Sequence, residues 1–269
     1  MKYILILLSA AFLALTAYLI CENVLILSVR REKLGKRVKI AHISDVHKKN
    51  LGKDNIRLTE LVRAEKPDVI FLTGDMVSRC ETCFSAHENM INALCSIAPV
   101  YMIMGNHEQS LPEEMQEEFL EMLKRTKAVC LRNETVKADI RGNSFNICGI
   151  EPPYGVYKKN GGYRDLDSIT DEMMLSLEGK CPDGETILLA HNPLFGEVYS
   201  RWGADYTFSG HVHGGSVRLF GIGMLSPERK FFPRYSKGVY DIGGKKLCVS
   251  GGIGKPRAFN APEIVVYEI

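Results

Sequence analysis

Strong net charge is missing from this sequence. Its 34 basic and 32 acidic side chains leave a formal net charge of only +2 at pH 7. Proteins that bind nucleic acid through its phosphates typically carry a marked excess of basic residues. We therefore expect no nucleic-acid partner. Internal repeats and low-complexity segments are also absent, and the 269 residues leave room for one large α/β domain or two small ones.

Cysteine is too sparse in this sequence to form a disulfide framework. Eight cysteines are spread over 269 residues, unlike the dense spacing of small disulfide scaffolds. Cys80 and Cys83 form a single CxxC pair, and no second pair accompanies it. A zinc knuckle needs two such pairs, so we interpret both residues as ordinary solvated or half-buried thiols.

Charge is absent from one long stretch at the N-terminus, residues 3–21. As a helix rising about 1.5 Å per residue, these 19 residues come close to spanning a hydrocarbon core of about 30 Å. The stretch also lacks the small-x-small end that signal peptidases require, because it closes on Tyr18-Leu19-Ile20-Cys21. We predict an uncleaved anchor in residues 1–21, followed by a catalytic domain in residues 22–269.

The charges that flank this stretch favour one orientation. Lys2 precedes it, whereas Arg30, Arg31, Lys33 and Lys36 follow it. The positive-inside rule then leaves the domain in the cytoplasm, as the unpaired cysteines also favour. We expect a single-pass protein of the cell membrane with a cytoplasmic domain.

Apolar and amphipathic segments alternate over the first half of the domain. Strands are predicted at 23–29, 38–44, 68–73 and 99–104, and helices at 54–65, 81–97 and 111–127. The charged stretch 30–37 contains Gly35 and is predicted to be a turn. Alternating strands and helices predict parallel strands joined by helical crossovers.

After residue 128 the segments become shorter. We predict strands at 128–131, 135–140 and 144–148, a loop at 151–164, a helix at 166–177, and strands at 186–190 and 204–209. The C-terminal part is predicted to hold strands at 216–220, 238–242, 246–250 and 263–268. The chain is therefore expected to form one domain whose second sheet comes from its C-terminal half.

Carboxylate, imidazole and amide side chains follow directly after the predicted strands. In open α/β sheets, sites are built at the carboxyl ends of strands, so these side chains are expected to converge. The set with these positions is Asp45, His47, Asp75, Asn106, His107, His191, His211 and His213. His42 lies inside a strand and His87 on a helix face, so both are interpreted as structural.

Apart from His107, these residues supply seven mixed oxygen and nitrogen ligands, too many for one tetrahedral zinc. They suit two ions that share a bridging carboxylate. No cysteine belongs to the set, so Mn, Fe, Zn, Co or Ni are the candidate metals. Two ions about 3.5–4 Å apart are the usual device for displacement at phosphorus by a metal-bridging hydroxide. His107, next to Asn106, is then the candidate proton donor to the leaving oxygen.

The ordered motifs Asp45-x-His47, Gly74-Asp75, Gly105-Asn106-His107-Glu108, His191 and Gly210-His211-Val212-His213 resemble the calcineurin-like metallophosphoesterase superfamily. The anchor and the C-terminal tail are similar to its YkuE-like membrane-associated branch. The resemblance implies a four-layer α/β/β/α sandwich of two mixed sheets with a dinuclear site at the sheet edge. It also implies ligand roles: Asp45, His47 and His213 for one ion, Asn106, His191 and His211 for the other, Asp75 as the bridge, and His107 as acid or phosphate contact.

Two positions depart from the family pattern. Ser78 stands where many relatives carry a second Asp, and Glu108 stands where many carry Asp. Neither is an expected ligand, so metal binding is not in question. Glu108 is interpreted either as a brace for a ligand or as a favourable charge at a helix N-terminus.

Alternative functions remain open at this point. A membrane-anchored metal-binding scaffold without catalysis would need the ligands but not His107. A single-zinc amidase or peptidase would need fewer ligands and a His-Glu-x-x-His motif, which is absent. The substrate of a phosphoesterase could be a phosphorylated small molecule, a nucleotide sugar, or a lipid-linked compound such as a UDP-diacylglucosamine.

A basic and aromatic segment, residues 226–235, follows the last two histidines after one short predicted strand and a turn. Aromatic side chains together with Arg and Lys favour a membrane–water interface. One interpretation is that it admits an amphiphilic substrate from the membrane. The other is that Phe231 and Phe232 belong to the core.

Overall fold

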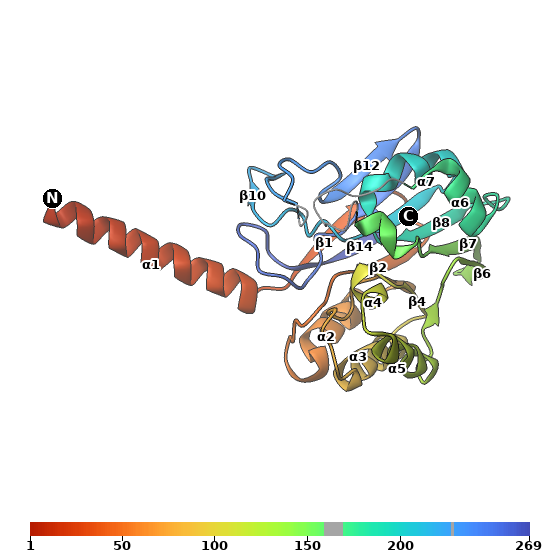
Figure 1. Ribbon diagram of the computed structural model, residues 1–269, viewed down its shortest axis with the longest axis horizontal. Helices are drawn as coiled ribbons and strands as arrows, with labels where there is room; N and C mark the ends of the chain where they lie inside the picture. Colours follow the sequence, from red (N-terminus) through yellow and green to blue (C-terminus); the bar gives the residue numbers. More distant parts are fainter. Residues whose placement is uncertain (159–168, 227–228) are drawn as a thin grey trace.

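The computed structural model describes residues 1–158, 169–226 and 229–269. Its first helix, α1 (Lys2–Val24), projects from the rest of the protein (Figure 1). α1 is long and apolar enough to cross a membrane, a test that a signal sequence near an N-terminus would also pass. The helix therefore continues three residues beyond the predicted anchor.

The first sheet carries the strands of the N-terminal half. Its order is β1 (Ser28–Lys33), β14 (Glu263–Glu268), β2 (Lys39–Ile43), β3 (Val69–Thr73), β4 (Val100–Ile103) and β5 (Val129–Cys130). The neighbours from β2 to β5 are parallel, as predicted, whereas β14 runs antiparallel to β2. The sheet is therefore mixed.

The second sheet is also mixed. Its order is β12 (Gly238–Ile242), β13 (Lys245–Val249), β9 (Tyr206–Ser209), β8 (Thr186–Ala190), β7 (Asn143–Ile150) and β6 (Glu134–Ile140). The neighbours from β13 to β7 are parallel, and β6 and β12 are antiparallel edges. A small hairpin, β10 (Arg218–Leu219) with β11 (Ile222–Gly223), stands outside both sheets.

The central strands are buried on both faces, so their alternate side chains enter different cores. In β3, Val69 and Phe71 join Ile187 and Leu189 of β8 between the two sheets. The intervening residues of β3 face the outer side, where they pack against α2 (Ile56–Glu65), α3 (Ser85–Cys95) and α5 (Glu113–Lys124). This alternation explains why the strands carry near-continuous apolar runs.

Helices cover the outer face of each sheet (Figure 1). α6 (Asp171–Glu178) and α7 (Gly196–Trp202) pack against the second sheet around Leu188 and Met174. The layers are thus helices, sheet, sheet and helices, which confirms the predicted four-layer α/β/β/α sandwich. Short helices at Lys53–Asn55, Asn106–Gln109 (α4), Tyr154–Tyr157 and Pro193–Phe195 lie in the connections.

Several predicted elements were wrong. The first strand is Ser28–Lys33 and not 23–29, so it occupies the stretch predicted to be a turn. β1 is an edge strand that pairs only with β14, and edge strands tolerate charged side chains such as Arg30 and Arg31. The last strand, β14, joins the first sheet and not the second.

Helix boundaries also differ. α3 begins at Ser85 and not at residue 81, and α6 spans Asp171–Glu178 where 166–177 was predicted. Residues 166–168 of that prediction lie outside the described residues, as do 159–164 of the predicted loop. Cys80 and Cys83 are exposed in the coil before α3, and all eight cysteines are free.

Candidate metal centre

Five strand ends meet where the two sheets face each other. Asp45, Asp75 and Asn106 follow β2, β3 and β4 of the first sheet, and His191 and His211 follow β8 and β9 of the second. Both sheets present the carboxyl ends of parallel strands at this edge. The predicted convergence of these side chains is therefore observed.

The chain turns sharply as soon as it leaves these strands. Asp45, His47, Asp75, His211 and His213 all adopt left-handed backbone conformations, with φ between 51° and 64°. For a residue with a Cβ this conformation costs roughly 1–2 kcal/mol. Strain of this kind gathers at functional sites, where the surrounding structure enforces it.

Glycine permits close approach of the ligand loops, both between the two sheets and within the first sheet. A Cβ on Gly210 would lie 1.8 Å from Ser44 Oγ and 2.3 Å from Asp45 Oδ2. A Cβ on Gly105 would lie 2.3 Å from Asp75 Oδ1. These glycines therefore let the ligand loops touch one another.

Among the described residues, three overlapping groups of side chains have ligand atoms within 4.8 Å of one another, and each could hold a metal ion. They are Asp45 with His47 and His213, His47 with Asp75 and His107, and Asp75 with His191 and His211. None of the three contains a cysteine or uses His42 or His87. The second group was not expected, because it places His107 as close to the carboxylate as the proposed ligands.

Asp75 stands at the junction of these groups. Its Oδ2 lies 3.5 Å from His191 Nε2, 3.7 Å from His47 Nε2 and 3.9 Å from His107 Nε2. Asp45 Oδ1 lies 3.8 Å from His213 Nε2 and 3.9 Å from His47 Nε2. One carboxylate thus faces two sets of donors, as a bridging ligand would.

The donors around His191 lie on the other side of Asp75. Its Nε2 is 3.1 Å from Asn106 Oδ1 and 3.2 Å from His211 Nδ1. Its Nδ1 lies 2.7 Å from the carbonyl oxygen of Thr73, to which it donates in the tautomer with a proton there. That hydrogen bond directs the Nε2 lone pair into the centre, as in metal-binding histidines.

Several buried ring nitrogens lack partners within the protein. Both ring nitrogens of His47 and Nδ1 of His213 make no hydrogen bond, although the two residues are only 3% and 6% exposed. A buried polar group without a partner costs about 1–3 kcal/mol. Of these nitrogens, Nε2 of His47 faces both Asp45 and Asp75, so a metal ion there would give it a partner, and the donor set fits metal ligation.

The electrostatics of the centre favour the ligand forms of His47 and Asp75. Burial lowers the pKa of His47 to about 3, so its imidazole is neutral at physiological pH. Burial opposes ionisation of Asp75, but His191, His107 and His47 together hold its pKa well below the usual range. The other two groups behave differently: burial raises the pKa of Asp45, and although burial opposes protonation of His191, the Asp75 and Asp45 carboxylates raise its pKa to about 10. Binding of a cation would displace the proton from His191 and ionise Asp45. A neutral imidazole and an ionised carboxylate are the forms that bind metal.

Glu108 braces the loops that carry the ligands. Its buried carboxylate accepts hydrogen bonds from the backbone N–H groups of Asp75, Val77 and Gly105, at 2.8–3.0 Å. Burial and the nearby Asp75 carboxylate raise the pKa of Glu108 to about 7. Both interpretations from sequence therefore hold, because Glu108 braces the ligand loops and also lies in the first turn of α4, where it accepts from the N–H of Gly105.

His107 is surrounded by cations that sequence reasoning missed. Its Nδ1 accepts from the backbone N–H of Arg79, and its Nε2 lies 3.1 Å from Arg79 Nη2 and 3.4 Å from Lys255 Nζ. Burial, with contributions from Lys255 and Arg79, lowers the pKa of His107 to about 4. Arg79 lies four residues after Asp75 and could have been suspected, whereas nothing local marks Lys255.

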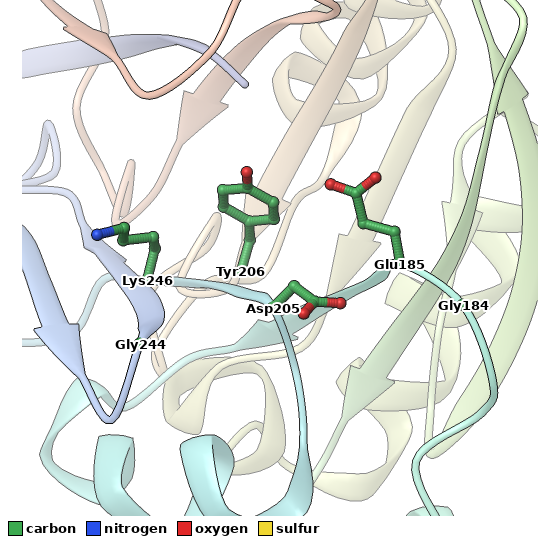
Figure 2. A pocket seen from close by; sticks show the side chains of 6 residues that line it. All are labelled: Gly184, Glu185, Asp205, Tyr206, Gly244 and Lys246. Carbon is green, nitrogen blue, oxygen red and sulfur yellow. The ribbon is translucent and has the colours of Figure 1, made fainter.

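A cavity of about 410 Å³ opens beside the centre. His47, Ser78 and Lys255 line its inner side, and Asn23 and Val24 of α1 line another. A second cavity, of about 440 Å³, is lined by Glu185, Asp205 and Lys246 among others (Figure 2). Glu185 and Asp205 directly precede β8 and β9, and Lys246 lies near the start of β13, so this cavity is at the opposite, amino-terminal ends of these parallel strands. Of these two cavities, both lined by described residues, the first is the one that reaches the metal centre.

The segment 226–235 is described except for Pro227 and Glu228. Phe231 and Phe232 are 75% and 62% exposed, so the interpretation as core residues is wrong for both. Tyr235, in contrast, is buried against Leu247 and Val249.

Comparison with known proteins agrees with this geometry. A family model described as calcineurin-like phosphoesterase matches residues 38–215. The uncharacterized metallophosphoesterase YkoQ of Bacillus subtilis is 26% identical over 249 residues, which cover 87% of this chain and 84% of that protein. The uncharacterized metallophosphoesterase YkuE of the same organism is 24% identical over 243 residues, covering 86% and 78%. The phosphodiesterase YaeI of Escherichia coli is 26% identical over 211 residues, covering 76% and 71%.

The match extends from β2 to the loop after β9 and contains every expected ligand. It covers well over half of the chain, and the relatives align over most of their own length. The predicted resemblance is confirmed. This chain belongs to the calcineurin-like phosphoesterases, metal-binding hydrolases that act on phosphoric esters.

Proposed function

We propose that Asp45, His47 and His213 hold one divalent ion, that Asn106, His191 and His211 hold a second, and that Asp75 bridges them. The observation that carries this assignment is the position of Asp75 Oδ2, which lies 3.5 Å from His191 Nε2 on one side and 3.7 Å from His47 Nε2 on the other. The unpartnered Nε2 of His47, which faces Asp45 and Asp75, supports it independently. The mixed N and O donors suit Mn, Fe, Zn, Co or Ni.

When bound, two divalent ions would acidify a water and neutralise charge on the phosphoryl oxygens. The protein's own groups would complete the reaction. His107 is the proposed donor to the leaving oxygen, since its ring lies beside Asp75 and Lys255. With a pKa of about 4 and an accepting Nδ1 the ring is neutral, so it donates a hydrogen bond from Nε2, and it acts as an acid only when the negative charge of a bound phosphate raises its pKa. Arg79 and Lys255 orient the phosphoryl group through their positive charges.

We further propose that the substrate is a lipid-linked or nucleotide-sugar phosphoric ester, such as a UDP-diacylglucosamine. The cavity beside His47 is bounded by the end of α1, which places an apolar helix next to the reacting centre. Three lysines, Lys48, Lys49 and Lys255, line the same cavity and would attract an anionic head group. An amphiphilic phosphate ester combines both features.

We also propose that residues 1–21 form an uncleaved single-pass anchor in the cell membrane and residues 22–269 the catalytic domain, on the cytoplasmic side. Glu22 and Asn23 support this division although they lie within α1. Glu22 is buried and accepts from the Phe259 N–H, and Asn23 exchanges two hydrogen bonds with the Arg257 backbone.

The test uses the full chain in detergent, stripped with a chelator and reloaded with Mn²⁺ or another candidate metal. Hydrolysis of a chromogenic phosphodiester and metal content are measured for wild type and Asp75→Asn. We expect a loss of several orders of magnitude in turnover together with lower metal content, because the bridging carboxylate would serve both ions.

The matched control is Asp183→Asn, whose side chain is exposed. It should keep wild-type activity and metal content. An Asp75→Asn variant with two metals and near-normal turnover would exclude the bridging role. Wild-type protein that binds two metals but hydrolyses no phosphoric ester would support the scaffold alternative.

A further inference from the structure

Outside α1 and the turn that follows it, exposed large apolar side chains gather on one surface. Its members, which we call the apolar surface, are Leu219, Phe220, Ile222, Phe231, Phe232 and Phe259. Elsewhere among the described residues of the domain, the exposed large apolar side chains Ile56, Val129 and Leu175 stand singly on α2, β5 and α6. Single exposed residues need no explanation, whereas a contiguous patch marks an interaction site.

Backbone pairing makes the apolar surface continuous. Val217, next to the β10–β11 hairpin, pairs with Ala258, and Leu225 pairs with Phe231. Phe231 and Phe232 have ring centroids 6.4 Å apart. Although its residues come from three stretches of sequence, the surface is therefore one unit of structure.

This surface lies beside the end of α1. The ring of Phe259 stacks on Tyr18 of α1 at a centroid distance of 5.8 Å. Figure 1 shows β10 on the side of the domain from which α1 projects. A bilayer that surrounds α1 would therefore meet the apolar surface first.

The orientation of α1 on the domain is fixed by hydrogen bonds. Asn23 Nδ2 donates to the Arg257 carbonyl at 2.7 Å, and the Arg257 N–H donates to Asn23 Oδ1 at 2.9 Å. The Arg257 guanidinium in turn donates to the carbonyl oxygens of Gly251 and His213. The anchor, the apolar surface and the metal centre thus share one rigid junction.

The chemistry of this surface suits the membrane–water interface. Four of its six side chains are phenylalanines, and Phe220 is fully exposed at the tip of the hairpin. Exposed Arg229 and Lys230 adjoin Phe231 in sequence. Apolar rings flanked by long basic side chains are the combination that partitions into head groups.

We propose that the apolar surface docks onto the lipid bilayer that holds α1. The cavity between Asn23 and His47 then opens at the lipid surface and not toward bulk water. This inference concerns where the domain lies and does not depend on which phosphoric ester is hydrolysed.

The test exploits the single tryptophan of the chain, Trp202 on α7. In a Trp202→Phe background, Phe220→Trp places a unique reporter on the apolar surface. The full chain is reconstituted in nanodiscs with or without brominated lipids, which quench tryptophan on contact, and retention of α1 is checked by mass. We expect Phe220→Trp to lose most of its fluorescence in brominated lipid.

Two controls make the result specific. Leu175→Trp in the same background reports from an isolated exposed position on α6, and the native Trp202 reports from α7; neither should be quenched. Phe231→Trp repeats the test from the other side of the surface in case the hairpin variant misfolds. Equal quenching at positions 220 and 175, no quenching at 220 and 231, or loss of α1 with release from the nanodiscs would each overturn the proposal.

Discussion

His42 offers a quantitative test of the core. It is fully buried in β2 between the sheets, where its ring packs on Phe208 and Tyr267. Its Nε2 lies 2.8 Å from Thr73 Oγ1, and its Nδ1 has no hydrogen-bond partner. Burial, with a smaller contribution from Arg30, lowers the pKa of His42 to about 3.

The sign of the effect follows from proton binding. Between pH 3 and 6.5 the unfolded chain would bind a proton at His42 and the folded protein would not, so stability falls as the pH falls through this window. One pKa unit corresponds to about 1.4 kcal/mol. Because the buried imidazole stays neutral, the free energy of unfolding should therefore be about 2 kcal/mol lower at pH 5 than at pH 8.

The perturbation is His42→Leu, which has similar volume and cannot be protonated. Urea unfolding of the full chain is followed at pH 8 and pH 5 with a chelator present, so that metal release does not contribute. Between pH 8 and pH 5 the free energy of unfolding should fall by about 2 kcal/mol more for wild type than for His42→Leu. Absolute stabilities can differ at pH 8 because the variant also leaves Thr73 Oγ1 without its partner.

The matched control is Thr73→Val, which removes the hydrogen bond but keeps the buried imidazole. It should lose as much stability on acidification as wild type. Equal acid sensitivity of wild type and His42→Leu would refute the reasoning, since it would mean that the folded protein accepts the proton at little cost.

Three further predictions concern the metal centre and the anchor. His107→Ala should lower turnover by roughly 10²–10⁴-fold yet keep its metals, and the loss should be smaller for substrates with a nitrophenolate leaving group. Equal losses for good and poor leaving groups would indicate that His107 binds the phosphate instead. Gly210→Ala should lower the metal content found by elemental analysis, because its Cβ would lie 1.8 Å from Ser44 Oγ. The control Gly155→Ala, at a position with open space around it, should leave the metal content unchanged. Deletion of residues 1–21 should leave a soluble, folded and active domain, since that part of α1 lies outside both sheets; aggregation in mild buffer would contradict this.

The candidate ligands could be found from the sequence because they are local features of strands. A buried parallel strand is a short apolar run, and its carboxyl end is marked by the first polar residue and an adjacent glycine, as at Gly74-Asp75 and Gly105-Asn106. Parallel strands share one edge, so convergence followed from the element order alone. The fold class followed from the same pattern, strengthened by the family resemblance.

Tertiary structure alone decided which distant groups complete the site. Lys255 reaches His107 across 148 residues, and Arg257 joins α1 to the loop beside His213. The position of β14 in the first sheet and the exposure of Phe231 and Phe232 depend on chain crossings that no local pattern encodes. Periodicity fixes which face a residue takes within its own element, whereas contacts between elements are set by how the sheets pack, and that is a property of the whole chain.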